Sequence, residues 1–232
     1  QMMAGVIILN TVTIPLGFLG SMVSDFQNRQ IDAMMVTPLK KYKVILGYYV
    51  TSLLITLAFS LVMWFLAVII ISIVTGISYS FGMIMFVCMW IFIFVFISTA
   101  FMILLSTFIN SINAFGAISG IFGGFVGFVA GIYLPITAKS PTILKLFSST
   151  VPFSHMSIHL KNILLQPSYN MVLANTGGNE QAVAKVRDIF GATELGFLNL
   201  EVSSGWMILV AALVAIGLFF VSIYRLTKKI KR

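Results

Sequence analysis

Few side chains in this sequence have types and spacings that could perform chemistry. His155 and His159 lie four residues apart, so one face of a helix could present both imidazoles to a metal ion. No cysteine or carboxylate lies near them in sequence to complete a site, and the only cysteine, Cys88, cannot form a disulfide bond within the chain. We therefore expect two interfacial histidines and no metal site.

The sequence also lacks the patterns of an enzyme. The segment around the histidines contains no Ser-His-Asp or paired-carboxylate arrangement, and no GxxxxGK[ST] phosphate-binding loop occurs anywhere in the chain. We expect no catalytic residues and no cofactor in this chain. If the protein uses the energy of nucleotide hydrolysis, the hydrolysis must take place on another polypeptide.

The acidic residues all lie outside the long apolar runs, and the lysines and arginines do so except at their boundaries. Ionisable groups inside a membrane are costly and usually mark proton relays, ion sites or voltage sensors. Their absence argues against a proton-coupled carrier or a voltage-gated channel, while a sodium site built from backbone carbonyls stays a weaker alternative. The six acidic residues are Asp25, Asp32, Glu180, Asp188, Glu194 and Glu201.

The secondary structure that carries these residues can be predicted from the amino-acid composition. Of the 232 residues, 59% are hydrophobic and 9% are charged, whereas an ordinary soluble domain carries roughly 25% charged residues. A helix needs about 20 apolar residues to cross a bilayer. The sequence therefore predicts an all-α integral membrane protein, a polytopic helical bundle forming one transmembrane domain over 1–232. The five predicted spans are 3–23, 44–74, 81–109, 114–134 and 206–224.

Basic residues flank these runs and predict the orientation. The loop 24–43 and the tail after the last span both carry clustered lysines and arginines, and alternation through the spans places both on one side. By the positive-inside rule that side is the cytoplasm, so 135–205 is extracellular. The net charge of +8 is thus explained by topology, and we expect no nucleic-acid partner. Because Gln1 is not a start residue, we expect a longer protein with six spans.

The extracellular segment contains three stretches with apolar residues at helical spacing, SPTILKLFSST, FSHMSIHLKNILL and NEQAVAKVRDIF. Short amphipathic helices lying on the outer membrane surface are one interpretation. Helices that only cap the bundle are the other, and we favour it.

The cytoplasmic loop reads SDFQNRQIDAMMVTPLKKYKVILGYY. Ile31, Met34 and Met35 share one helical face, and Pro38 ends the helix because the residue before a proline leaves helical space. Such a helix either anchors the loop at the interface or docks a partner.

This loop resembles the type-two ATP-binding-cassette (ABC) exporter permeases, a family of bacterial drug, lipid and polysaccharide exporters. The family has acidic residues after a span, an apolar pair, Thr-Pro-Leu, and Ile-Leu-Gly opening the next span. This chain has them in the same order, although Arg29-Gln30 stands where the family often has Gly-Thr. The resemblance implies that the loop couples to an ATPase subunit. The implied coupling residues are Asp25, Arg29, Asp32, Met34, Met35, Thr37 and Pro38.

Softer matches extend the resemblance over the whole chain, namely the glycine-rich GIFGGFVGFVAGIYLPI and the outer VPFSHMSIHLKNIL. It implies an exporter in the bacterial plasma membrane, formed by two permease copies, identical or not, and by ABC ATPase subunits that bind ATP and Mg²⁺. The phenylalanine-rich spans favour an amphipathic drug, peptide or lipid as substrate. The alternative function is a non-transporting membrane sensor or assembly protein that binds through its extracellular segment.

Two sets of residues inside the spans are candidates for helix packing or for lining the pathway. Small residues at four-residue spacing let helix backbones approach closely, and buried polar side chains at membrane depth face protein or a cavity. For both sets, packing within the chain is the favoured interpretation. The first set is Gly116, Gly120, Gly124, Gly127, Gly131 and the following Pro135, and the second is Asn10, Thr13 and Pro15.

Overall fold

The fold is seen in a computed structural model, which describes residues 2–31, 40–76, 79–137, 139–195 and 203–229. The described residues form helices and no strands, which confirms the all-α polytopic bundle. Five helices among them are long and apolar enough to cross a membrane. They are α1 (Met2–Gln27), α3 (Lys41–Thr75), α4 (Phe81–Thr107), α5 (Ile112–Val129) and α10 (Ser204–Lys229).

The chain divides into two compact units, which are described separately. The first unit comprises 1–9, 62–90 and 125–211, and the second comprises 10–61, 91–124 and 212–232. Each unit has an apolar core of its own. In the first the core includes Trp64 and Phe153, and in the second it includes Leu19, Ile45 and Phe94.

The two longest helices, α3 and α4, are apolar around their whole circumference, which is typical of helices surrounded by lipid and by other apolar helices. The 35 residues of α3 would extend for about 50 Å at 1.5 Å per residue. This exceeds the roughly 30 Å thickness of a hydrocarbon core, so α3 must tilt or project from the bilayer.

The helix α5 ends earlier than the predicted span 114–134, because a glycine turn closes it. After Val129, Gly131 adopts a φ of 65°, a left-handed conformation that glycine takes without steric cost. The N–H groups of Ile132 and Tyr133 both donate to the Gly127 carbonyl, at 3.0 and 3.1 Å. The apolar residues up to Leu134 therefore follow the helix instead of continuing it.

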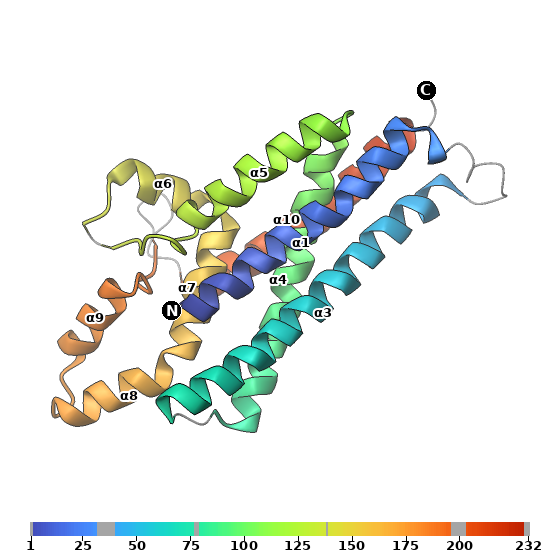
Figure 1. Cartoon of the computed structure of the whole chain (residues 1–232). Coiled ribbons are helices and arrows are strands. Elements are labelled where there is room, and N and C mark those ends of the chain that lie inside the picture. Colours follow the sequence, from blue (N-terminus) through green and yellow to red (C-terminus); the bar gives the residue numbers. More distant parts are fainter. Residues whose placement is uncertain (1, 32–39, 77–78, 138, 196–202, 230–232) are drawn as a thin grey trace. The chain divides into compact units, whose positions relative to one another are not determined.

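The described residues between α5 and α10 lie in the first unit and form four short helices (Figure 1). Three of them coincide with the predicted helical stretches, whereas α8 was not predicted. The prolines mark where helices begin: Pro152 lies in the first turn of α7, and Pro167 lies in the first turn of α8. The four are α6 (Thr142–Thr150), α7 (Pro152–Leu164), α8 (Gln166–Asn175) and α9 (Glu180–Ile189).

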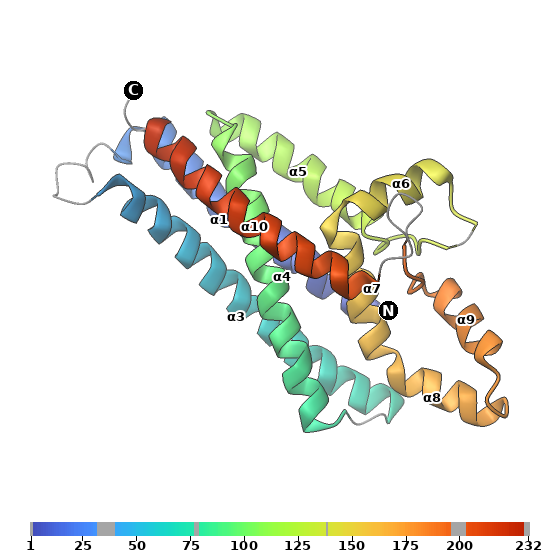
Figure 2. The same ribbon diagram turned by 180° about the vertical axis from the view of Figure 1, so that it is seen from behind.

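Within this segment, α7 is the buried element and α8 and α9 form a hairpin (Figure 2). The hairpin turn uses Gly177 and Gly178, with φ values of 63° and 87°, and Asn179 caps α9 by accepting from the Gln181 N–H at 3.0 Å. Nine of the thirteen residues of α7 are buried. This helix therefore serves as a core element of its unit and does not lie on a surface.

Candidate functional site

The candidate coupling site is the loop between α1 and α3, together with the helix ends that hold it, all within the second unit. The described part of the loop is shorter than the predicted 24–43, because α1 continues to Gln27 and α3 begins at Lys41. Asp25 thus lies in the last turn of α1 and does not start a separate helix. Five of the predicted coupling residues lie outside the described residues, namely Asp32, Met34, Met35, Thr37 and Pro38.

Asp25 links the helices on either side of the loop. Its carboxylate accepts a hydrogen bond from the Tyr48 hydroxyl on α3 at 2.5 Å, and both side chains are half-buried. Hydrogen bonds between a hydroxyl and a carboxyl group can tie two helices together where both side chains are shielded from water. The bond therefore fixes the end of α1 to the first two turns of α3.

Gln27 makes a second link, from the last residue of α1 to the first residue of α5. Its side-chain Oε1 accepts from the backbone N–H of Ile112 at 2.7 Å. The first N–H groups of a helix have no partner within the helix, so this contact satisfies one such group on α5. A displacement of the loop base would therefore act on α3 through Asp25 and on α5 through Gln27.

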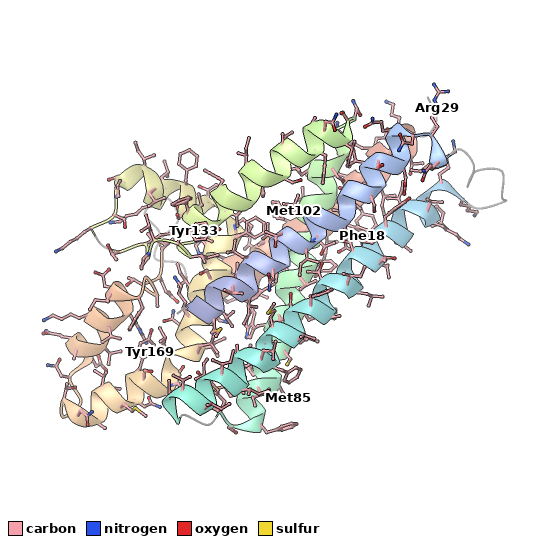
Figure 3. All side chains as sticks on the ribbon, viewed as in Figure 1. Phe18, Arg29, Met85, Met102, Tyr133 and Tyr169 are labelled. Atoms are coloured by element: carbon pink, nitrogen blue, oxygen red, sulfur yellow. The ribbon has the colours of Figure 1, made fainter. Side chains whose placement is uncertain are left out.

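Arg29 follows α1 in a left-handed backbone conformation, with a φ of 56°. Glycine is the usual residue at this position after a helix. The arginine side chain is exposed and projects away from the end of α1 (Figure 3). The chain thus presents a cation to solvent at the start of the loop.

A cation also lies at the neighbouring ends of α4 and α10, again in the second unit. The Arg225 guanidinium lies over the Phe108 ring, 3.9 Å from its centroid, which is a cation–π geometry. The exposed Lys43 in the first turn of α3 and the exposed Lys228 in the last turn of α10 add to the positive charge of this unit.

In the first span, the polar cluster predicted around Asn10, Thr13 and Pro15 is divided between different environments. Pro15 is buried, Thr13 is exposed and Asn10 is half-buried. The buried neighbour Thr11 accepts a hydrogen bond from Ser98 of α4 at 3.2 Å. The bonded pair is a helix–helix contact.

The glycines of α5 form two sets with different surroundings. A Cβ atom placed on Gly116, Gly120 or Gly124 would meet no described atom within 4 Å. The open stripe formed by these three residues is therefore a surface along which another helix could approach. At Gly127 a Cβ atom would instead collide with the ring of Tyr133, so this glycine is needed for the turn after α5.

That turn is held by a cluster of hydrogen bonds in the first unit, which we call the α7 clamp. The hydroxyls of Ser148 and Ser154 donate to the Val129 carbonyl at 2.7 and 2.9 Å, and Lys161 Nζ donates to the carbonyls of Gly131 and Gly191 at 2.8 and 3.4 Å. A cation is favourable where helix carbonyls end. The clamp thus joins the C-terminal ends of α5 and α9 to α6 and α7.

Lys161 is the central residue of the clamp. Its side chain is 1% exposed, and burial lowers the pKa of its ammonium group to about 8 because the charged form loses its hydration. Pro135 packs close to the same point, since a Cβ atom on Gly191 would lie 2.9 Å from the Pro135 Cβ. In the sequence alone, Lys161 is one of several charges of the outer segment and has no distinct role.

The two histidines lie on α7 and serve packing. His155 Nε2 donates to the Ser149 carbonyl at 2.9 Å, and the His159 ring lies edge-on to Trp90 with centroids 4.1 Å apart. Burial lowers the pKa of both imidazoles, which keeps them neutral at physiological pH. Among the described residues no group of three metal-ligating side chains is present.

Sequence reasoning missed the residues that tie the elements together. Tyr48, Gln27 and Lys161 are conspicuous in no motif, and their partners lie 23, 85 and 30 residues away along the chain. The one available signal was Lys161 itself, a lysine inside an apolar helical stretch.

Comparison with known proteins supplies the family. Residues 1–224 match the family described as ABC-2 family transporter protein. Curated proteins and solved structures gave no match to the chain.

Proposed function

Because the chain belongs to the ABC-2 transporter family, whose members are transmembrane transport subunits, we propose that it is the permease of an ATP-driven exporter. The ATP and Mg²⁺ are bound by separate ABC ATPase subunits. The exporter operates in a bacterial plasma membrane and carries an amphipathic drug, peptide or lipid outward.

The observation that carries this proposal is the pair of hydrogen bonds at the base of the loop. Asp25 bonds to α3 and Gln27 bonds to α5, so the last turn of α1 contacts two other spans directly beside the loop. An ATPase that grips the loop and changes shape would move the three helix ends together. The loop therefore has the connections that a coupling element needs.

The distribution of charged residues supports ATP as the energy source and supports the proposed orientation in the membrane. The acidic residues lie outside the predicted spans, so the bilayer core offers no carboxylate to bind a coupling proton. The basic loop and tail favour the cytoplasmic side, where ATP is available. Outward transport follows from the family resemblance, and the apolar spans favour a substrate that partitions into lipid.

The open stripe on α5 supports a second permease copy as partner. The stripe consists of three glycines spaced four residues apart, Gly116, Gly120 and Gly124, which have free space beside them. Helices in membranes associate through such small residues. We place the contact between two copies of the permease along this stripe.

The experiment is reconstitution of the chain with its cognate ATPase in proteoliposomes, followed by measurement of substrate-stimulated ATP hydrolysis and of substrate movement. Tyr48→Phe removes the hydroxyl that binds Asp25, which is worth about 1.5–3 kcal/mol for a bond to a charged group. We expect this variant to retain basal hydrolysis and to lose most of the stimulation.

The neighbouring tyrosine provides the matched control. The Tyr49 hydroxyl is buried and has no hydrogen-bond partner among the described residues, so Tyr49→Phe should leave stimulation unchanged. Failure of the chain to associate with any ATPase, or equal loss of stimulation in both variants, would contradict the proposal.

A sensor or assembly function is the second candidate, and one hollow in the first unit favours it. The hollow lies between α8 and α9 and has a volume of about 480 Å³, within the size range of small-molecule sites. A purified chain that binds a ligand through this hairpin without any ATPase would support the alternative. The lining residues are Leu173, Glu180, Gln181, Val183, Ala184 and Arg187.

A further inference from the structure

One face of α3 carries hydroxyl groups although the helix is otherwise apolar. Ser52, Thr56 and Ser60 follow one another at four-residue spacing, which places their side chains on the same side of the helix. All three are 0% exposed, whereas the neighbouring Leu54 and Phe59 are 57% and 56% exposed. We call these three residues the hydroxyl row. The row is therefore turned inward in the second unit, while large apolar side chains face outward.

Two hydroxyls of the row, those of Ser52 and Ser60, have no hydrogen-bond partner among the described residues. Other buried hydroxyls of this unit are paired with their own helix. Thr56 donates to the Ser52 carbonyl at 2.7 Å, and Ser222 donates to the Leu218 carbonyl at 2.7 Å. An unpaired buried hydroxyl loses its bonds to water without replacing them. Packing alone would therefore favour alanine at positions 52 and 60, so the two serines indicate a second arrangement in which their hydroxyls are paired.

A third unpaired hydroxyl lies on α4 in the same unit. Thr99 is 0% exposed, and its Oγ1 has no partner among the described residues. It lies one turn from Phe96, whose ring contacts the Tyr49 ring edge-on with centroids 6.3 Å apart. Tyr49 in turn lies one turn before Ser52 on α3. The faces of α3 and α4 that carry these hydroxyls therefore meet at this contact between rings.

The hydroxyl row begins one turn after the contact that ties α3 to the base of the loop. Tyr48, which donates to Asp25 of α1, lies four residues before Ser52 on the same helix. Rigid helices carry a displacement of one end to the turns that follow. A movement of the loop base that turned or withdrew the start of α3 would therefore separate the row from α4.

Resting on the proposed exporter function, we propose that the hydroxyl row forms a wall of the passage that opens when the ATPase moves the coupling loop. In the arrangement of this structure the row is closed. When α3 withdraws from α4, the hydroxyls of Ser52, Ser60 and Thr99 bind water and then the hydrogen-bonding groups of the transported molecule, such as amides and hydroxyls. Because these hydroxyls are unpaired in the closed arrangement, opening restores hydrogen bonds that closure removes.

The test measures the access of water to single cysteines, Ser52→Cys and Ser60→Cys, in a Cys88→Ala background. The full chain is reconstituted with its cognate ATPase in proteoliposomes. The membrane-impermeant reagent 2-sulfonatoethyl methanethiosulfonate is added without nucleotide or during ATP hydrolysis, and it reacts with thiolates in water. If the open arrangement is a minor state of about 10% or less without nucleotide, both cysteines should react roughly tenfold faster or more during hydrolysis.

Ser98→Cys is the matched control within the second unit. Ser98 has the same size and is also 0% exposed, but its hydroxyl donates to Thr11 at 3.2 Å. A cysteine there should stay unreactive in both conditions. Leu54→Cys on the exposed face of α3 is the lipid control and should also stay unreactive, whereas Lys185→Cys on the exposed surface of α9 should react at once in both conditions.

Slow reaction at positions 52 and 60 in both conditions, with ATP hydrolysis intact, would show that the row only packs. It would overturn this inference and leave the proposed exporter function standing. Equal acceleration at position 98 would show that the whole unit loosens during hydrolysis, which would overturn the inference as well. A chain that associates with no ATPase would contradict the proposed function itself, and the row would then have no passage to line.

Alanine variants give a second measurement that does not depend on labelling. Ser52→Ala and Ser60→Ala each remove an unpaired buried hydroxyl and should raise the unfolding temperature in detergent, whereas Ser98→Ala removes a paired hydroxyl and should lower it. Lower unfolding temperatures for Ser52→Ala and Ser60→Ala would show that their hydroxyls are paired in the closed arrangement, and the proposal would fail.

Discussion

Arg29 occupies a backbone conformation that suits glycine, with a φ of 56°. The left-handed region costs an L-residue about 1–2 kcal/mol, whereas the added flexibility of a glycine in the unfolded chain costs about 0.5–1 kcal/mol. We expect Arg29→Gly to stabilise the protein by a net amount between about 0 and 1.5 kcal/mol. The measurement is thermal unfolding in detergent.

Arg29→Lys is the control for this prediction, since it keeps both the charge and the strained backbone and should leave the unfolding temperature unchanged. A lower unfolding temperature for Arg29→Gly than for wild type would contradict the prediction. It would show that the arginine side chain stabilises the folded state by more than its left-handed backbone conformation destabilises it. Measuring ATPase stimulation in the same variants separates the structural role of Arg29 from a role in coupling.

Lys161 makes stability depend on pH. Burial lowers its pKa to about 8, while in the unfolded chain it stays near the ordinary 10.5. Between these values the unfolded chain holds a proton that the folded chain has released, so stability rises as pH increases through this window. We expect wild type to gain up to about 3 kcal/mol relative to Lys161→Met across the window.

The unfolding temperatures of wild type and Lys161→Met are measured from pH 7 to pH 10, and the difference between them is taken at each pH. Groups that titrate in both proteins contribute equally to the two unfolding temperatures, so their contributions cancel in this difference. The exposed Lys185→Met serves as control and should show a constant difference from wild type. A constant difference for Lys161→Met would mean that the ammonium group is solvated and that the clamp is open.

At the scale of the elements, the end of α9 shows how tightly the outer helices are packed. Gly191 has a φ of 58°, and a Cβ atom there would lie 2.8 Å from the Ile136 backbone nitrogen. Gly177 has a similar φ of 63° but open space around it. Gly177→Ala should therefore cost only the conformational penalty, about 1–2 kcal/mol, whereas Gly191→Ala should cost a further 1–3 kcal/mol, roughly, from the steric clash.

Unfolding temperatures of the two alanine variants in detergent give the comparison directly. Equal effects would show that the backbone near Pro135 and Ile136 shifts to admit the methyl group. The clamp around Lys161 would then be more compliant than the hydrogen bonds to Gly131 and Gly191 imply.

The sequence could predict the spans because a bilayer crossing demands a long apolar run, and α1, α3, α4, α5 and α10 each contain one. Their ends were less predictable. The end of α5 depends on a turn at Gly131 in which Tyr133 folds back on Gly127, and apolar composition continues unchanged through it. The helix α8 escapes prediction because Pro167 indicates an interruption of helical structure, although proline also fits the first turn of a helix.

The candidate site was predictable only in outline. The loop motif and its proline follow from local sequence, so the position of the proposed coupling element could be named in advance. The bonds from Asp25 to Tyr48 and from Gln27 to Ile112 could not, because they depend on how separate helices pack. Most of the loop's predicted contact residues, including Met34, lie outside the described residues, and their role in coupling stays a prediction.

At the scale of the whole molecule, the proposed pairing of two permease copies depends on the open stripe of α5. Gly120→Leu places a large side chain in the middle of the stripe, and overpacking of this kind costs about 1–3 kcal/mol. We expect the proposed permease pair to weaken by roughly tenfold or more, since each 1.4 kcal/mol corresponds to about a factor of ten. Single-molecule photobleaching counts of labelled chains in vesicles measure the dimer fraction.

Gly217→Leu on α10 is the matched control. Gly217 is also a glycine within a span, a Cβ atom placed on it would likewise meet no described atom within 4 Å, and it lies outside the stripe. This variant should leave the dimer fraction unchanged. Equal dimer fractions for Gly120→Leu and wild type would place the contact between copies elsewhere.

The bond from Gln27 to the first N–H of α5 also bears on how the protein is made. The two residues are 85 positions apart, so α1 leaves the ribosome well before α5 exists. The start of α5 is therefore completed by a helix already inserted in the membrane. During biogenesis this contact can form only after α5 has been synthesised, so the N-terminal end of α5 acquires its partner late.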